Sequence, residues 1–243
     1  MRWAPIAGAL LAALSAGAAL VGTARAERTE EGARIARLVR DFPALRERSS
    51  AGLWRPVEPW SISDADECLA ALDAQGIDFR RVPAAHGPVI HPVEITGPIA
   101  GVRYRKRRTS RPFIVSCELA TRMPALSRVL RGEGVREVEV LSSWRRAPRT
   151  SFHTMGLALD LYGFQGEGSR GEGFRWTVER DFSDRRDAAT CPLPEAADPI
   201  HRIACALWDS RRFSTVITPR YSPGHHDHLH VDLRPEDPRG FLR

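Results

Sequence analysis

The chain has 243 residues, a length that suits one domain preceded by a targeting segment. Its apolar fraction of 42% and charged fraction of 27% exclude general disorder, and its formal net charge of +6 makes it basic. Lys106 is the only lysine, so nearly all of the basic residues are arginines, a bias that we attribute to genome composition rather than to a particular ligand.

The first 26 residues have the features of a secretory signal peptide. Arg2 precedes an Ala/Leu/Gly-rich run over 4–22, and Ala24-Arg25-Ala26 provides an A-x-A cleavage site. The apolar run approaches the length of a membrane span, so an uncleaved anchor is the alternative. We expect cleavage after Ala26, a secreted or periplasmic mature protein, and no stable membrane anchor.

Residues 27–62 are expected to be peripheral, with an amphipathic helix over 27–39 and a Ser/Pro/Trp-rich linker over 49–60. Residues 63–243 are expected to form a single domain. Its predicted helices span 64–75, with Ser63 as the N-cap, 116–130 and 199–211. Its predicted strands span 78–82, 89–95, 102–105, 135–141, 156–161, 174–181, 214–218 and 228–233. Because helices come before and between strands joined by turns, we predict an α+β fold in which a small antiparallel sheet, flanked by helices, carries a zinc site.

The four cysteines predict two disulfides. An even number in an exported protein favours disulfides, with three possible pairings. Cys191 and Cys205 are close in sequence and bracket a Pro-rich turn and the start of a helix, so we pair them, which leaves Cys68 for Cys117. The alternative is four buried free thiols. No C-x-x-C pair occurs, which argues against a structural zinc knuckle.

Five of the eight histidines fall in two short segments, 151–160 and 225–230. The second segment leads into a predicted strand, where side chains at i and i+2 lie on one face. His228, His230 and Asp232 are therefore expected to project together.

Asp160 lies on another predicted strand, from which it can meet His230 across the sheet. His153 comes seven residues earlier, and a Gly-containing turn can fold it back toward Asp160. Two histidines and one carboxylate make a donor set for a catalytic zinc ion (Zn²⁺), with the fourth position open for water. The alternative is a loose surface metal tract. It is less favoured, because the spacing of His153 and Asp160 and the H-x-H pair occur in one exported chain.

A basic run at 104–108 is the other charged motif of the chain. It can contact an anionic polymer, but we favour a solvated hairpin rim. A phosphoesterase or nuclease is disfavoured, because the sequence has neither a second carboxylate-rich motif for a two-metal site nor a Gly-rich phosphate-binding loop. The Gly-rich stretch 166–171 is interpreted as a flexible loop near the site. We expect no nucleic-acid partner.

The two histidine segments resemble those of the LAS metallopeptidases, which include lysostaphin-type endopeptidases, D-Ala-D-Ala carboxypeptidases and the hedgehog amino-terminal domain. Within this group the chain is most similar to the bacterial extensin-like C-terminal domain proteins, over residues 68–233. The similarity also covers Cys68, Cys117 and Cys205 and the segments 143–145 and 219–221. The residues that carry the zinc-site resemblance are Ser151-x-His153-x-x-Gly156-x-Ala158-x-Asp160 and His228-x-His230.

This resemblance implies an exported zinc metallopeptidase that cleaves amide bonds in peptidoglycan peptides. It implies that His153, Asp160 and His230 are the zinc ligands and that His228 lies beside the metal and acts on the attacking water. It implies that Arg145 contacts the scissile carbonyl oxygen, although a plain surface arginine is the alternative. The roles are chemically consistent, since histidine transfers protons near neutral pH and a fixed cation stabilises an oxyanion.

The chain also departs from the related families. The carboxypeptidase branch has a Glu three residues before its last histidine ligand, where this chain has the shorter Asp227. His225 stands where the endopeptidase branch has a histidine. The general base is therefore open between His228 and Asp227, and we favour His228, with Asp227 orienting it. Segment 86–93 lacks a cysteine usual in extensin-like proteins, in line with the even count of four.

The substitution at Asp227 keeps a second function class open. In that alternative, the domain is a non-catalytic module that binds cell-wall peptide and uses zinc structurally. Under either function, the expected ligand is a peptidoglycan peptide and the expected state is a monomer.

Overall fold

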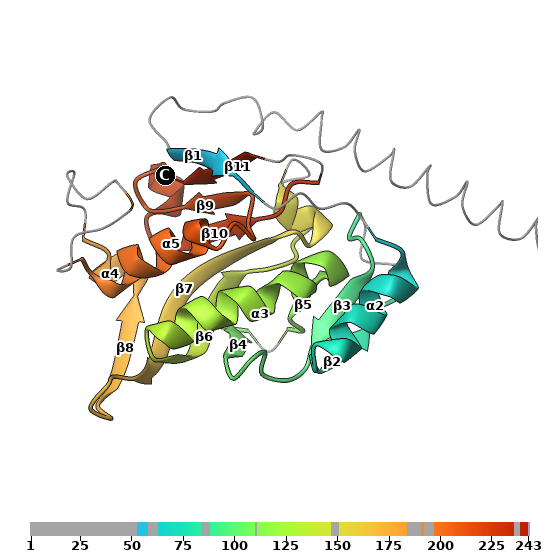
Figure 1. Ribbon diagram of the computed structural model, residues 1–243, viewed down its shortest axis with the longest axis horizontal. Helices are drawn as coiled ribbons and strands as arrows, with labels where there is room; N and C mark the ends of the chain where they lie inside the picture. The colour runs from blue at the N-terminus through green and yellow to red at the C-terminus, as the bar shows by residue number, and fades with distance from the viewer. Residues whose placement is uncertain are drawn as a thin grey trace, which may run out of the picture. The chain divides into compact units, whose positions relative to one another are not determined.

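Most of the described chain is built around one mixed β-sheet (Figure 1). The computed structural model describes residues 53–57, 63–83, 88–109, 111–146, 151–183, 191, 197–235 and 239–242. Within these ranges the main sheet has eight strands in the order β1-β11-β9-β10-β7-β6-β4, with β8 also paired to β7. Its strands are β1 (Leu53–Pro56), β4 (Arg103–Lys106), β6 (Val135–Ser142), β7 (Ala158–Glu167), β8 (Gly173–Thr177), β9 (Thr215–Ile217), β10 (Leu229–Asp232) and β11 (Arg239–Leu242).

A smaller sheet and a set of helices complete the described fold. The smaller sheet has the order β2-β3-β5, with β2 at Phe79–Arg81, β3 at Pro92–Ile95 and β5 at Ile114–Ser116. In Figure 1, α3 and α5 both lie across the near face of the main sheet, α3 beside β6 and α5 beside β9. The helices are α2 (Ala65–Ala74), α3 (Cys117–Gly132), α4 (Val178–Asp181) and α5 (Pro199–Asp209), with short 3-10 turns η2 (Phe152–Met155) and η4 (Pro223–His225).

The apolar spacing of the helices explains how they pack on the sheet. In α5, Ile200, Ile203 and Leu207 recur every three or four residues, and all three are fully buried. Asp198 caps this helix by accepting the amide protons of Ile200 (3.1 Å) and His201 (3.0 Å). Helices α3 and α5 thus cover one face of the main sheet and leave its other face to carry polar residues.

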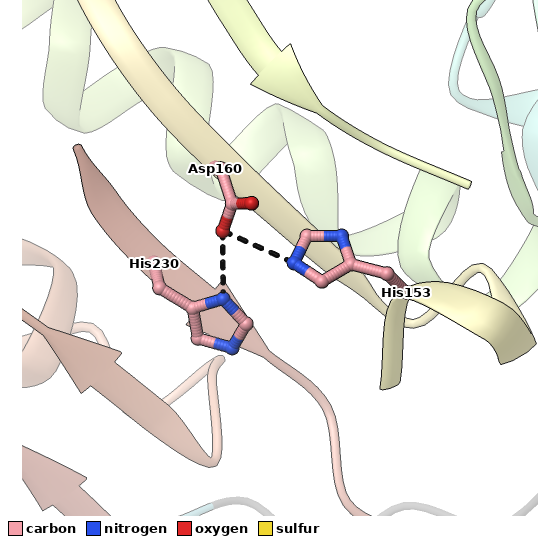
Figure 2. A group of neighbouring side chains, drawn as sticks. All are labelled: His153, Asp160 and His230. Carbon is pink, nitrogen blue, oxygen red and sulfur yellow. Dashed lines mark hydrogen bonds and ion pairs between the residues drawn. The ribbon is translucent and has the colours of Figure 1, made fainter. Parts of the chain in front are cut away.

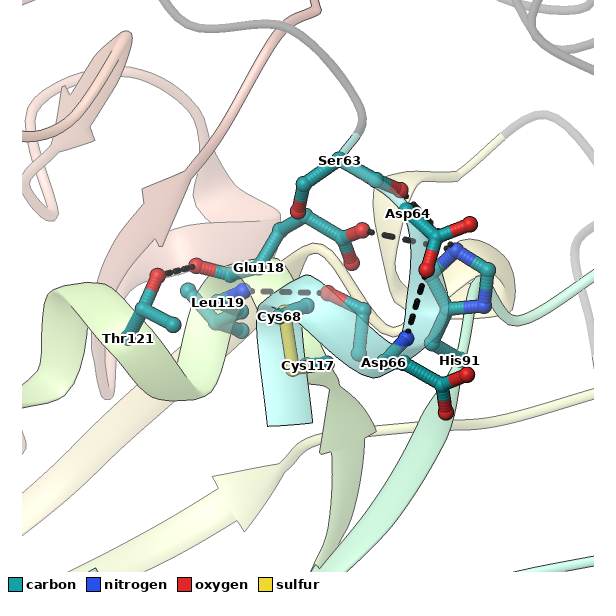
Figure 3. Close-up of a disulfide and its surroundings, with 10 residues drawn as sticks. Ser63, Asp64, Asp66, Cys68, His91, Cys117, Glu118, Leu119 and Thr121 are labelled. Carbon is teal, nitrogen blue, oxygen red and sulfur yellow. Dashed lines mark hydrogen bonds and ion pairs between the residues drawn. A yellow bond between two sulfur atoms is a disulfide. The ribbon is translucent and has the colours of Figure 1, made fainter. Parts of the chain in front are cut away.

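Two disulfides occur, and both match the predicted pairs. Cys68 is bonded to Cys117, which joins the start of α2 to the start of α3 with 6.1 Å between the Cα atoms (Figure 3). Cys191 is bonded to Cys205 in α5, with a Cα separation of 5.7 Å. The pairing prediction is therefore confirmed, and two disulfides fit an oxidising compartment.

The α+β class is confirmed, but the main sheet is larger than predicted and is not wholly antiparallel. β4 runs parallel to β6, and β9 runs parallel to β11. The chain between β4 and β6 contains β5 and helix α3, which is long enough to return the chain in the same direction. β1 lies in the predicted linker 49–60 and pairs with β11.

Several predicted elements shift in detail. The N-cap of α2 is Asp64 rather than Ser63, because the Asp64 carboxylate accepts the Asp66 amide (2.9 Å; Figure 3). The predicted strand 174–181 divides into β8 and the short helix α4. Strands β5 and β11 were not predicted from the sequence, and β7 continues six residues beyond Leu161.

The predicted signal peptide over 1–26 and the predicted helix over 27–39 lie outside the described residues. Among the helices that the structure does describe, none is both long enough and apolar enough to cross a membrane.

Candidate metal centre

Strands β7 and β10 bring Asp160 and His230 together. The two strands pair antiparallel, and His230 lies directly opposite Asp160 in their register. The neighbouring residues Leu159 and Val231 are fully buried on the other face of the pair. The predicted meeting of Asp160 and His230 across the sheet is therefore what the structure shows.

The turn η2 brings His153 back over the start of β7. Ser151 caps the turn, and Gly156 ends it with a φ of +69°. A side chain at Gly156 would place its Cβ 2.6 Å from the Ser116 amide nitrogen and 2.8 Å from Val89 Cγ1, both closer than a real contact. Only glycine fits there, because it combines a left-handed backbone with a close approach of neighbouring chains.

The three predicted ligands form one group (Figure 2). Asp160 Oδ1 lies 3.0 Å from His153 Nε2 and 2.8 Å from His230 Nδ1. These three are the His, Cys, Asp or Glu residues of the described chain whose donor atoms all lie within 4.8 Å of one another. Tetrahedral zinc with ligand bonds of about 2.0–2.1 Å holds its ligand atoms roughly 3.4 Å apart, so small side-chain movements would accommodate it.

The outer nitrogen of each histidine contacts an oxygen. His153 Nδ1 donates a hydrogen bond to the Ser143 carbonyl oxygen (2.8 Å), which can only accept. His230 Nε2 lies 3.3 Å from Asp232 Oδ2. Such partners fix the tautomer of a metal-binding histidine and point the lone pair of the other nitrogen at the metal. Here both inner nitrogens point at Asp160 Oδ1.

Burial and mutual contact shift the pKa values of His153 and Asp160. Burial lowers the pKa of His153 and outweighs the opposing attraction of Asp160, so His153 is neutral at pH 7. Its Nε2 lies 3.0 Å from Asp160 Oδ1, within hydrogen-bond distance. Asp160 stays ionised, because its two histidine partners hold its pKa well below the usual range despite burial. A carboxylate that stays ionised and a neutral histidine are the forms in which these side chains bind a metal ion.

The pKa of His230 is shifted in the opposite direction to that of His153. Burial acts to lower its pKa, but hydrogen bonds to Asp160 and Asp232 outweigh burial and raise it to about 9. Without a metal, His230 therefore carries a proton on each nitrogen, since a neutral ring has only one to share between two carboxylates. Metal binding would displace the proton from Nδ1.

A scan against protein-family models matches residues 66–241 to the extensin-like protein C-terminus family. The chain belongs to this extensin-like family. No curated protein and no solved structure matches the chain.

The extensin-like domain places His228 and Asp227 at the edge of the cluster. His228 Nε2 lies 3.4 Å from Asp160 Oδ1, and His228 Nδ1 donates to Asp227 Oδ1 at 2.8 Å. The His228 ring is buried, whereas the Asp227 side chain is 20% exposed. His228 thus reaches the site directly, and Asp227 reaches it only through His228.

His225 and Arg145 lie around this centre. The His225 ring packs against His228 (5.1 Å between centroids), and burial together with His230 and His228 lowers its pKa to about 4. Arg145 is exposed, and its guanidinium donates to Ser151 Oγ at 3.4 Å. The structure therefore brings all six predicted site residues into one neighbourhood, with Arg145 at its exposed edge.

Two orienting groups were not predicted as part of the site. Asp232 was placed on the face of His230 but was given no role, although the i, i+2 spacing is the signal that identifies it. The Ser143 carbonyl carries no signal in the sequence, because any residue has a carbonyl and only its position beside His153 matters.

Proposed function

We propose that this extensin-like domain is an exported zinc-dependent hydrolase that cleaves amide bonds in peptidoglycan peptides. The observation that carries the proposal is the convergence of His153 Nε2 and His230 Nδ1 on one oxygen of Asp160. Two histidines and one carboxylate match the donor set of catalytic zinc sites. A bound zinc ion would lower the pKa of a water molecule to about 7 and polarise a carbonyl group.

His228 is the proposed proton acceptor. Its Nδ1 proton is donated to Asp227, so in the neutral ring the lone pair lies on Nε2, which faces the cluster. When Nε2 takes a proton from the attacking water, the Asp227 carboxylate stabilises the resulting imidazolium. The same proton can then pass to the leaving amine.

Arg145 is the proposed oxyanion partner. Its exposed side chain lies beside His153 at the rim of the centre, where a carbonyl oxygen of a bound peptide can reach it. A cation in that place stabilises the charge that develops on the oxygen in the transition state. The substrate class rests on the resemblance of the two histidine motifs to the LAS metallopeptidases.

The test is muropeptide mapping after purified sacculi are incubated with the zinc-loaded mature protein. We expect new peptide termini from one cleaved amide bond, and none with Asp160→Asn. If the zinc-loaded protein binds sacculi but releases no product, the proposal is wrong and the non-catalytic cell-wall peptide-binding module is the better description.

A further inference from the structure

A second polar feature of the main sheet is a basic pocket of about 490 Å³ beside strands β4, β6, β7 and β8. It contains the basic run that the sequence analysis interprets as a solvated rim. The residues that line it are Arg105, Lys106, Arg107, Arg108, Glu137, Glu139, Gln165 and Arg175.

The basic pocket and the candidate metal centre share one face of the sheet. Val140 and Leu161 are paired across β6 and β7, and both are fully buried on the core face. Their neighbours Glu139 and Asp160 therefore project from the opposite face. Glu139 pairs with Gly163, three residues beyond Asp160 on β7, and the register shifts between Glu139 and Val140 and between Val140 and Ser142 shorten this stretch. The pocket wall therefore lies at most about 10 Å from the centre along the strand, at about 3.3 Å per residue.

The pocket carries more positive than negative charge. Glu139 Oε1 accepts hydrogen bonds from Arg175 (2.6 Å) and Gln165 (3.2 Å), and Glu137 lies 3.5 Å from Arg105.

The remaining cations of the pocket are Lys106, Arg107 and Arg108. Among the described residues, none of these three forms an ion pair with a carboxylate. Burial, followed by the charge of Arg111, lowers the pKa of Lys106, as expected where cations are crowded. These three cations can therefore pair with a negatively charged group of a ligand.

Arg107 is held ready for such a ligand. Its guanidinium carbon lies 3.4 Å from the centre of the Tyr162 ring, and its amide donates to the Val140 carbonyl at 2.8 Å. Stacking leaves the edge of the guanidinium free to pair with a carboxylate through two hydrogen bonds. Arg108 follows with a φ of +57°, so the turn places consecutive cationic side chains around one pocket.

We propose that the basic pocket binds a side-chain carboxylate of the same peptide substrate, within about three residues of the bond at the metal centre. This inference rests on the proposed function for the identity of the substrate. An extended peptide advances about 3.3 Å per residue, so three residues or fewer span the distance between the two places. A continuous polyanion is disfavoured as the ligand of this pocket. It would bring several negative charges close to Glu137 and Glu139, which repel them, whereas a peptide brings a single carboxylate.

The test measures binding, not turnover, by calorimetry on the mature chain. The ligands are a synthetic stem peptide with free side-chain carboxylates and the same peptide with those carboxylates amidated. We expect amidation to weaken binding about tenfold, and Arg107→Gln to weaken binding of the free peptide about tenfold, because a lost charged hydrogen bond of roughly 1.4 kcal/mol is tenfold in affinity. Arg107→Gln should leave binding of the amidated peptide unchanged.

Matched variants separate the pocket from general charge and from folding defects. Arg136→Gln removes an exposed arginine that does not line the pocket and should have no effect. Arg108→Gln should act like Arg107→Gln without disturbing the stacking on Tyr162. Equal binding of free and amidated peptide would overturn the proposal. Binding of duplex DNA that is as tight as binding of the peptide, and equally sensitive to Arg107→Gln, would also overturn it.

The same experiments distinguish this proposal from the proposed function. A carboxylate preference that depends on Arg107, in a protein that cleaves nothing, would support the pocket and refute the hydrolase. Cleavage of both peptides at equal rates and with equal affinity would support the hydrolase and refute the pocket.

Discussion

Replacement of Asp227 by Asn is expected to slow amide hydrolysis about tenfold while the metal stays bound. Asp227 accepts one hydrogen bond from His228 Nδ1 at 2.8 Å. A hydrogen bond to a charged group contributes about 1.5–3 kcal/mol. Asn keeps an oxygen acceptor and loses the charge, so about 1.4 kcal/mol of transition-state stabilisation is lost, which is tenfold in rate.

Replacement of His228 by Ala should cost more, because it removes the proton acceptor itself. The expected loss is about 100-fold or more, in the range of lost general acid–base catalysis. Both variants should retain zinc, since neither residue belongs to the three-ligand group.

The assay is the rate of product release from sacculi, measured by chromatography with mass detection, together with metal content by elemental mass spectrometry. Asp73→Asn serves as the control, because Asp73 is an exposed acid in α2. The reasoning is refuted if Asp227→Asn abolishes turnover while His228→Ala stays near the wild-type rate. Asp227 would then be the base, as in the carboxypeptidase branch.

Four further outcomes are expected. The mature domain should bind about one zinc per chain by elemental analysis, and His153→Ala, Asp160→Ala and His230→Ala should each lose it; stoichiometric metal in all three would refute the site. Asp232→Asn should weaken zinc affinity about 10–100-fold in a chelator competition, because the charged acceptor for the outer nitrogen of His230 is lost, and an unchanged affinity would exclude that role. Asp198→Ala should lower the stability by about 2 kcal/mol and the melting temperature by roughly 4–8 °C. Burial acts to raise the pKa of Asp198, but hydrogen bonds from His201 and Ser183 outweigh burial, so the pKa is lower in the folded protein than in the unfolded chain. The stabilisation by Asp198 is therefore complete above the unfolded pKa of about 4 and is lost as pH falls toward the folded pKa. A wild-type advantage over Asp198→Asn that does not shrink between pH 6 and pH 3 would contradict this. Thiol titration under denaturing, non-reducing conditions should find no free thiol, whereas two or more would contradict the disulfides.

The amino-acid sequence by itself determines the identity of the three candidate ligands and the pairing of the cysteines. A strand places every second side chain on one face, so the H-x-H pair and the apolar residues around it specify that His228 and His230 share the face of Asp160. The glycine at 156 is equally local, since its left-handed backbone is required wherever His153 is turned back. The spacing within short segments thus predicts the ligands, whereas Cys68 and Cys117, 49 residues apart, are paired by elimination.

Other features of the protein were decided only by its tertiary structure. β1 and β11 are short segments that become strands because β1 pairs with β11 and β11 pairs with β9, and neither has enough apolar alternation to predict it alone. β4 and β6 run parallel because helix α3 lies between them in the chain, and β9 and β11 run parallel because β10 lies between them. The Ser143 carbonyl becomes a partner of His153, and the basic run at 104–108 becomes the wall of a pocket on the face of the metal centre, only once β4, β6 and β7 lie side by side. Spacing along a chain determines which side chains share a face, whereas the order of strands in a sheet determines which faces meet.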